Sequence, residues 1–166
     1  MKIQFKRAVT VAIGLLAALS AAIAPTAAQA SVKPAKASAA ATWECAGTHN
    51  GNQHLAPGGE IYQGGYECAG NYEWIVQSNG NFVEYLKSKA DVIWATNKAT
   101  GLPSSMIMQS GGNFIESVGL GATAWSTGTN GHSGAYVCFQ IDGNLVVYAE
   151  TGLYNCAGTA LWANGH

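Results

Sequence analysis

The chain has 166 residues, a formal net charge of −1, and charged residues at only 10% of its positions. Three of its eight basic residues lie within the first seven positions. The remainder therefore carries five lysines, no arginine and nine acidic residues, a net charge of −4. Because binding to a phosphate backbone needs clustered Lys or Arg, nucleic acid is excluded as an expected partner.

Residues 1–30 have the three parts of a secretory signal peptide. Basic residues within positions 2–7 precede an apolar run at 8–24, and residues 28–30 (Ala-Gln-Ala) have the small-x-small form of a cleavage site. A membrane-spanning helix needs about 20 strongly apolar residues, so the shorter, Ala-rich run favours a cleaved signal over a membrane anchor. We expect a secreted, extracellular protein without a membrane span in its mature form.

Residues 31–42 (SVKPAKASAAAT) contain no aromatic residue and no Leu, Ile, Met or Phe. Such a segment buries too little apolar surface to offset the entropy lost on ordering, so it is predicted to be a flexible linker. Residues 43–166 remain for the folded part, which is long enough for one domain with one core.

The four cysteines are Cys45, Cys68, Cys138 and Cys156. An even number in an exported chain implies two disulfides. Of the three possible pairings, two join distant ends of the domain, whereas Cys45–Cys68 with Cys138–Cys156 closes two local loops and is favoured. A zinc site is the alternative, but the close Cys or His pairs that such sites use are missing. No metal and no cofactor are expected.

A nine-residue motif with the pattern Gln-x-x-Gly-Asn-apolar-apolar occurs three times. The copies begin at Gln77, Gln109 and Gln140, which are 32 and 31 residues apart. A tryptophan follows each glutamine after 16 to 22 residues, at Trp94, Trp125 and Trp162. This regular spacing predicts three equivalent structural units.

Short alternating runs of apolar and polar residues, separated by glycine-rich turns, predict β-strands and no long helix. Asn-Gly, Gly-Gly and Asp-Gly pairs are typical of hairpin turns because they tolerate positive φ. One small sheet cannot bury its apolar face alone, so we expect three sheets around a pseudo-threefold axis. The three tryptophans are expected to meet in the shared core. The alternative is that they stack on sugars.

Side-chain alternation in the third repeat separates a polar face from an apolar face. The polar face comprises Gln140, Asp142, Asn144, Val146 and Tyr148. The apolar face, expected to contact the core, comprises Ile141, Gly143, Leu145 and Val147. If Asp142-Gly143 forms a hairpin turn, Gln140 and Asn144 become cross-strand neighbours and still share one face. Amides, a carboxylate and a phenol around one apolar side chain can satisfy the hydroxyl groups of a monosaccharide.

The spacing Gln-x-Asp-x-Asn-x-Val-x-Tyr resembles the signature of the bulb-type (monocot) mannose-binding lectins, over roughly residues 52–165. The resemblance implies a β-prism II fold, with three four-stranded sheets around a pseudo-threefold axis, and mannose-containing glycans as partners. By this resemblance Gln140, Asp142 and Asn144 would bind the axial 2-hydroxyl and the 3-hydroxyl of mannose. Tyr148 would bind the 4-hydroxyl, and Val146 would contact the ring carbons.

The other two repeats depart from this signature. The first repeat has Asn79 in place of the acid and otherwise matches, with Gln77, Asn81, Val83 and Tyr85. Since a charge-assisted hydrogen bond is about twice as strong as a neutral one, weaker binding is expected there. The second repeat has Gly111 for the acid and Ser117 for the tyrosine. It is expected to be a structural turn without sugar binding.

Two other function classes compete with a lectin. An enzyme is not expected, because no Ser-His-Asp or Cys-His arrangement has local support, although glutamates could still form a pair in space. The second alternative is a protein-interaction or bacteriocin-like antimicrobial module without sugar activity. The resemblance also leaves a homodimer open, since lectins of this family often exchange C-terminal strands, but the tail after Trp162 is short.

Overall fold

The computed structural model describes Cys45, residues 49–86 and residues 91–165. The predicted signal peptide at 1–30 and the predicted linker at 31–42 lie outside these ranges and stay predictions. Within the described ranges, no helix has the length and apolar character needed to cross a membrane.

Twelve β-strands in the described ranges form three four-stranded antiparallel sheets. The first sheet has the order β3 (Tyr66–Ala69), β4 (Tyr72–Val76), β5 (Phe82–Leu86) and β6 (Asp91–Ala95). The second has the order β2 (Glu60–Tyr62), β7 (Ser104–Met108), β8 (Phe114–Val118) and β9 (Ala122–Ser126). The third has the order β1 (Gln53–Leu55), β10 (Tyr136–Phe139), β11 (Leu145–Tyr148) and β12 (Ala160–Ala163).

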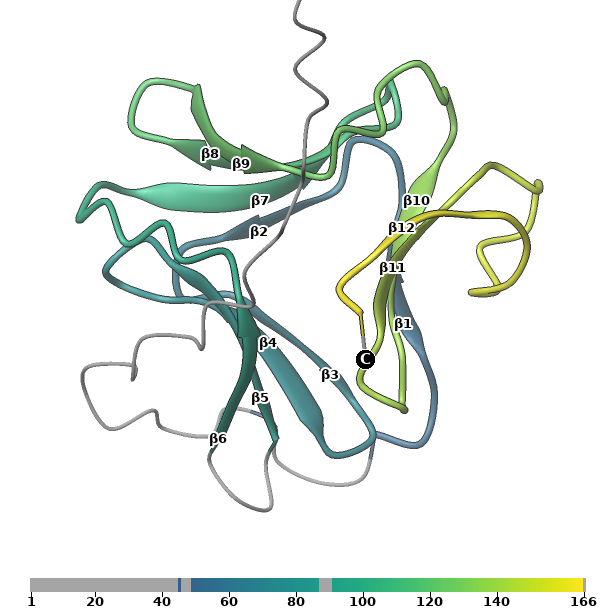
Figure 1. The fold of residues 1–166 in the computed structure, drawn as a ribbon, viewed down its shortest axis with the longest axis horizontal. Coiled ribbons are helices and arrows are strands. Elements are labelled where there is room, and N and C mark those ends of the chain that lie inside the picture. The colour runs from purple at the N-terminus through teal and green to yellow at the C-terminus, as the bar shows by residue number, and fades with distance from the viewer. Residues whose placement is uncertain (1–44, 46–48, 87–90, 166) are drawn as a thin grey trace, which may run out of the picture. The chain divides into compact units, whose positions relative to one another are not determined.

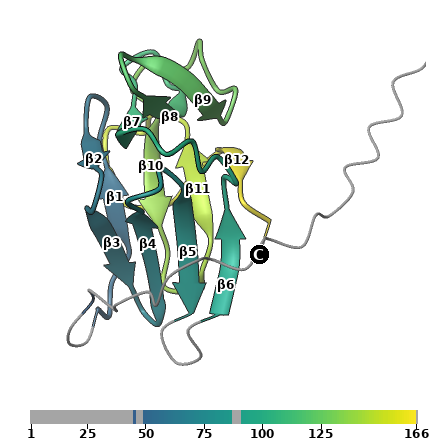
Figure 2. The same cartoon turned by 90° about the vertical axis from the view of Figure 1, so that its left-hand side faces the viewer.

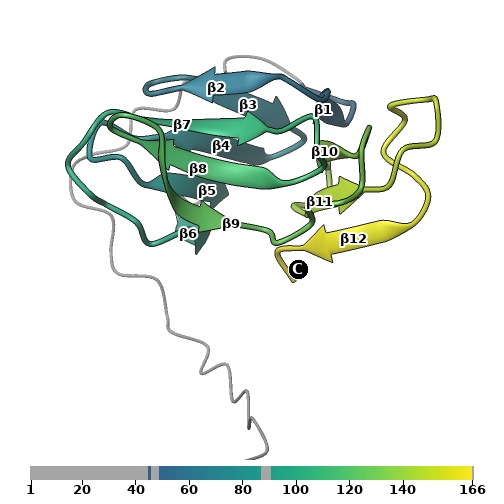
Figure 3. The same ribbon diagram turned by 90° about the horizontal axis from the view of Figure 1, so that it is seen from above.

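The three sheets surround a common centre, as Figure 1 shows. Figure 2 looks onto the sheet that contains β3 to β6, and Figure 3 looks onto the sheet that contains β7 to β9. Each sequence repeat supplies three consecutive strands of one sheet. The N-terminal strands β1 and β2 complete the sheets of the third and second repeats. The expected all-β class with three four-stranded sheets is confirmed.

The core lies between the sheets and is formed by every second side chain along the strands. Its buried members include Trp74, Phe82, Phe114, Phe139 and Leu145. Burying such large apolar groups is the main source of stability in a small β domain.

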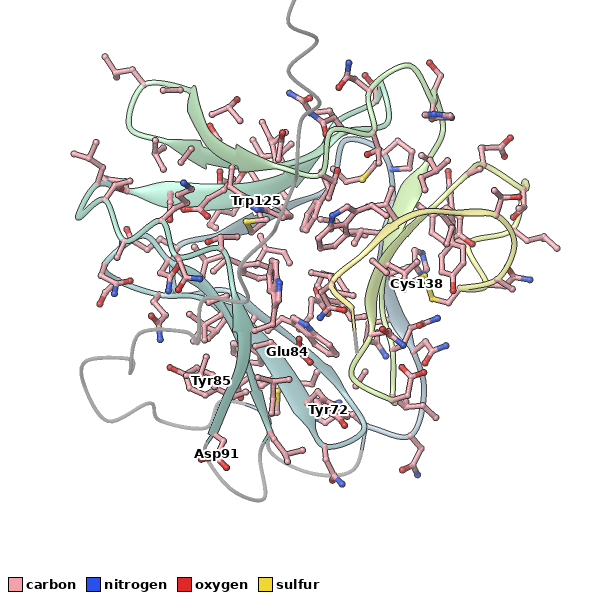
Figure 4. The ribbon with its side chains drawn as sticks, viewed as in Figure 1. Tyr72, Glu84, Tyr85, Asp91, Trp125 and Cys138 are labelled. Carbon is pink, nitrogen blue, oxygen red and sulfur yellow. A yellow bond between two sulfur atoms is a disulfide. The ribbon has the colours of Figure 1, made fainter. Side chains whose placement is uncertain are left out.

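The three repeated tryptophans pack against this core and against each other. Their ring centroids are 5.5 Å apart for Trp94 and Trp125, 5.9 Å for Trp94 and Trp162, and 5.4 Å for Trp125 and Trp162. All three contacts are edge-to-face, a favoured aromatic geometry. The predicted meeting of the tryptophans in the shared core is confirmed, and Figure 4 shows Trp125 directed toward the centre.

Both predicted disulfides are present. Cys45 pairs with Cys68 at a Cα separation of 5.9 Å, and Cys138 pairs with Cys156 at 5.6 Å. Each bond closes a local loop, as the favoured pairing requires.

All three motifs form the same hairpin turn. In the third, the Gln140 N–H donates to the carbonyl of Asn144 at 2.9 Å, and the Gly143 N–H donates to the carbonyl of Gln140 at 3.0 Å. Gly143 has a φ of +92°, the left-handed conformation that glycine adopts without strain. This pattern is a three-residue hairpin loop with a bulge at the glycine.

The turn corrects one prediction. Ile141 and Gly143 do not continue a strand toward the core, and the Ile141 side chain is 50% exposed. The reason is that a turn interrupts the alternation on which the prediction rested. Leu145 and Val147, which follow the turn, are buried in the core as expected.

Candidate functional site

The structure places the polar set of the third repeat on the outward face of β10, β11 and the turn between them. Gln140 Nε2 donates a hydrogen bond to Tyr148 Oη at 3.0 Å. Asp142 Oδ1 accepts from the Asn144 N–H at 3.0 Å, and Asn144 Nδ2 lies 3.4 Å from Asp142 Oδ2. Val146 faces outward between these two pairs, because its neighbours Leu145 and Val147 face the core.

This set is a mixture of fixed and accessible groups. Asp142 is exposed, whereas Gln140, Asn144 and Tyr148 are half-buried and Val146 is buried. The Gln140–Tyr148 bond holds two long side chains in one orientation above Val146. The Asp142–Asn144 contacts fix the turn. The result is a polar cluster beside Val146, whose side chain is only 4% exposed.

The first repeat has the same arrangement. Gln77 Nε2 donates to Tyr85 Oη at 2.7 Å, and Asn79 Oδ1 accepts from the Asn81 N–H at 3.0 Å. The difference is burial, since Tyr85 is only 2% exposed. This burial raises the pKa of the Tyr85 hydroxyl above its ordinary value. The first repeat therefore offers less accessible polar surface than the third.

The asparagine of the motif has a structural role in the first two repeats. Asn81 Oδ1 accepts from Thr96 Oγ1 and from the Lys98 N–H, at 3.1 Å and 3.0 Å. Asn113 Oδ1 accepts in the same way from Thr127 Oγ1 and the Thr129 N–H, both at 3.1 Å. These bonds tie each turn to the segment that follows the repeat's last strand. They explain why the second repeat keeps Asn113 although it lacks the acid and the tyrosine.

A long loop beside the third repeat was not anticipated. It connects β11 to β12, comprises residues 149–159, and is tied to the sheet by Cys156. The Tyr136 hydroxyl donates to the carbonyl of Ala157 at 3.2 Å, and Gln140 Nε2 lies 3.4 Å from the carbonyl oxygen of Cys156. The sequence signal was the distance from glutamine to tryptophan, which is 22 residues here against 17 and 16 elsewhere.

Three fully buried carboxyl groups, those of Glu73, Glu84 and Glu116, were also missed. Glu84 and Glu116 face the core and are fully buried, at the position that Val147 occupies in the third repeat. Burial raises the pKa of Glu84 to about 8 and that of Glu116 to about 7. Glu84 Oε2 also accepts from Asn164 Nδ2 at 2.7 Å, which links the first repeat to the end of the third. Alternation within the motif, applied to all three copies, could have placed Glu84 and Glu116 inside.

Potential metal ligands do not converge in the part of the chain that the structure describes. No group of three or more His, Cys, Asp or Glu side chains there could hold a metal ion.

Three four-stranded sheets, an axial tryptophan cluster and a repeated outward motif define this chain as having the β-prism II fold of the bulb-type mannose-binding lectins. The resemblance indicated by the motifs is thus confirmed by solved structures. A comparison with protein families and with curated proteins finds no match.

Three solved lectins illustrate the similarity. A Japanese Marasmius oreades lectin is 27% identical, with a TM-score of 0.59, over 71% of this chain and 94% of that lectin. A monomeric monocot mannose-binding lectin from Gastrodia elata is 26% identical, with a TM-score of 0.56, over 68% and 96%. The mannose-specific agglutinin from snowdrop (Galanthus nivalis) bulbs, complexed with methyl-α-D-mannoside, is 29% identical, with a TM-score of 0.53, over 68% and 94%.

Proposed function

We propose that this protein is a secreted lectin that binds mannose-type sugars, chiefly through its third repeat. One observation carries the proposal. Only the third repeat combines the complete set of Gln140, Asp142, Asn144, Val146 and Tyr148 with an exposed carboxylate and a partly exposed tyrosine. The similarity to lectins described as mannose-binding supports the choice of sugar.

The hydrogen bonds within the site decide which atoms remain for a sugar. Since Gln140 Nε2 donates to Tyr148 Oη, the tyrosine hydroxyl keeps its own proton to donate. Gln140 keeps Oε1 as an acceptor, and the Asp142 carboxylate accepts strongly because it is charged. Asn144 Nδ2 supplies a further donor. These groups alternate donors and acceptors, as neighbouring sugar hydroxyls require.

The first and second repeats contribute less to sugar binding in this proposal. Asn79 in the first repeat provides a neutral acceptor, and the burial of Tyr85 removes accessible surface. The second repeat has lost both the acid and the tyrosine, so it serves the fold. One chain then carries one strong site.

Export is part of the proposal. Residues 1–30 have the pattern of a cleaved signal peptide. Two disulfides in a small β domain are typical of proteins that work in an oxidising compartment.

The site is proposed to bind without catalysis. A glycoside hydrolase needs two carboxyl groups beside the sugar, one with a raised pKa. Glu84 and Glu116 have raised pKa values, but both are fully buried in the core and cannot contact a glycan on the outward face. Burial also raises the pKa of Glu67, which lies on β3 of the first sheet and not in the sheet that carries the third motif.

The proposal is tested by titration calorimetry of the mature protein with methyl α-mannoside. We expect Asp142→Ala to weaken binding roughly 10- to 100-fold, because it removes a charged acceptor. Asp91→Ala is the matched control, since Asp91 is the other aspartate of the chain and is exposed at the start of β6. The absence of any binding heat up to tens of millimolar sugar would rule out the lectin function and direct attention to a protein partner.

A further inference from the structure

The loop between β11 and β12 distinguishes the third repeat from the other two. It has 11 residues, whereas the connection from β8 to β9 in the second repeat has only residues 119–121. Nearly all of its residues are exposed, with Cys156 as the buried exception. Long loops that are held in place by a rigid scaffold commonly carry function.

The loop is anchored beside the candidate mannose site. Cys138, the strand partner of Val146, forms the disulfide to Cys156. The carbonyl oxygens of Cys156 and Ala157 lie near Gln140 Nε2 and Tyr136 Oη, at 3.4 Å and 3.2 Å. The position of the loop is therefore set by the same strands that carry the motif.

The backbone of the loop is strained at its anchor. Cys156 has a φ of +57°, a left-handed conformation that is unfavourable for a residue with a side chain. Such conformations persist only where the surroundings enforce them. The disulfide and the burial of Cys156 provide that enforcement.

A series of contacting aromatic rings connects the candidate site with the exposed side of the loop. Tyr148 stacks on Tyr136 with ring centroids 5.9 Å apart, and Tyr136 contacts Tyr154 edge-on at 5.1 Å. Tyr154 also stacks on His54 at 5.4 Å. Despite these contacts Tyr154 is 42% exposed. The two centroid distances place its ring within about 11 Å of the Tyr148 ring.

We propose that Tyr154 forms a second sugar subsite, which stacks on the glycan residue next to the mannose held by the third repeat. This inference rests on the proposed lectin function and extends it from a monosaccharide to an oligosaccharide. A tyrosine ring offers a large, rigid contact surface at low conformational-entropy cost. Because the disulfide already holds the loop, binding does not have to order it, which favours affinity.

The test compares methyl α-mannoside with an α-linked mannobiose and mannotriose by titration calorimetry. For the parent protein we expect an oligosaccharide to bind at least tenfold more tightly than the monosaccharide. Tyr154→Ala should abolish this gain and leave the affinity for methyl α-mannoside within twofold of the parent value. Tyr154→Phe should retain the gain, because it keeps the ring.

Leu153→Ala is the matched control, since Leu153 is the preceding residue of the same loop and is 67% exposed. It should leave both affinities unchanged. The subsite is wrong if oligosaccharides bind no more tightly than the monosaccharide, or if Tyr154→Ala keeps the gain. It is also wrong if Tyr154→Ala weakens the binding of all the sugars equally, which would indicate that Tyr154 only supports the loop. In each of these cases the lectin function stands, whereas failure of the parent to bind any of the sugars overturns both proposals.

Discussion

Two adjacent glycines in the second motif have opposite steric surroundings. A Cβ atom at Gly112 would lie 2.2 Å from the carbonyl oxygen of His132, and Gly112 has a φ of +93°. A Cβ atom at Gly111 would meet nothing within 4 Å. The first glycine position of the motif is therefore free to vary, as Asn79 and Asp142 show in the other repeats, whereas the second is restricted to glycine.

At this residue scale we predict that Gly112→Ala lowers the free energy of unfolding by about 1–3 kcal/mol, because it combines positive φ with a backbone clash. Gly111→Ala should change it by no more than about 0.5 kcal/mol. Urea denaturation of both variants measures the difference. Equal effects would contradict the assigned turn geometry.

At the scale of elements, a disulfide ties the long loop between β11 and β12 to strand β10. Cys138 and Cys156 are 18 residues apart in sequence. A cross-link of this span restricts the unfolded chain by an entropy equivalent to about 3 kcal/mol.

The double variant Cys138→Ala/Cys156→Ala is therefore expected to lose about 3 kcal/mol of unfolding free energy. Urea denaturation without reductant gives the value. Cys45→Ala/Cys68→Ala, with a span of 23 residues, should lose a similar amount and serves as comparison. A loss below about 1 kcal/mol in the first variant would show that the disulfide constrains the unfolded chain less than its span implies.

At the scale of the whole molecule, two of the buried glutamates make stability depend on pH. The pKa of Glu84 is raised to about 8 and that of Glu116 to about 7, from 4.5. Between pH 4.5 and these values the folded state binds more protons than the unfolded chain. The contribution of these two groups to the free energy of unfolding is therefore greatest below pH 4.5. It falls as the pH rises from 4.5 through 7 and 8.

We expect the urea midpoint to be higher at pH 5 than at pH 8, and Glu84→Gln/Glu116→Gln to remove most of this difference. Glutamine keeps the size of the side chain and cannot ionise. Glu150→Gln is the control, because Glu150 is exposed. An unchanged pH dependence in the double variant would show that the two carboxyl groups are not its source.

Local features of the fold were predictable from the sequence because they depend on neighbouring residues. Each Gln-x-x-Gly-Asn motif specifies a hairpin turn through its glycine, and alternation after the turn directs Leu145 and Val147 inward. The same local logic favoured the pairing of Cys138 with Cys156. It also grouped Gln140, Asp142 and Tyr148 on one surface, although their roles in sugar binding stay predictions.

Contacts between distant parts of the chain were decided only by the tertiary structure. Strand β1 pairs with β10 through His54 and Cys138, and no periodicity in the sequence indicates this partner. The burial of Glu84 beside Asn164 likewise joins the first repeat to the end of the third. The placement of Tyr154 against His54 depends on both the disulfide and β1. The sequence by itself therefore determined the repeats and their turns, and three-dimensional packing determined what surrounds the third repeat, because packing partners are set by the closed arrangement of the three sheets.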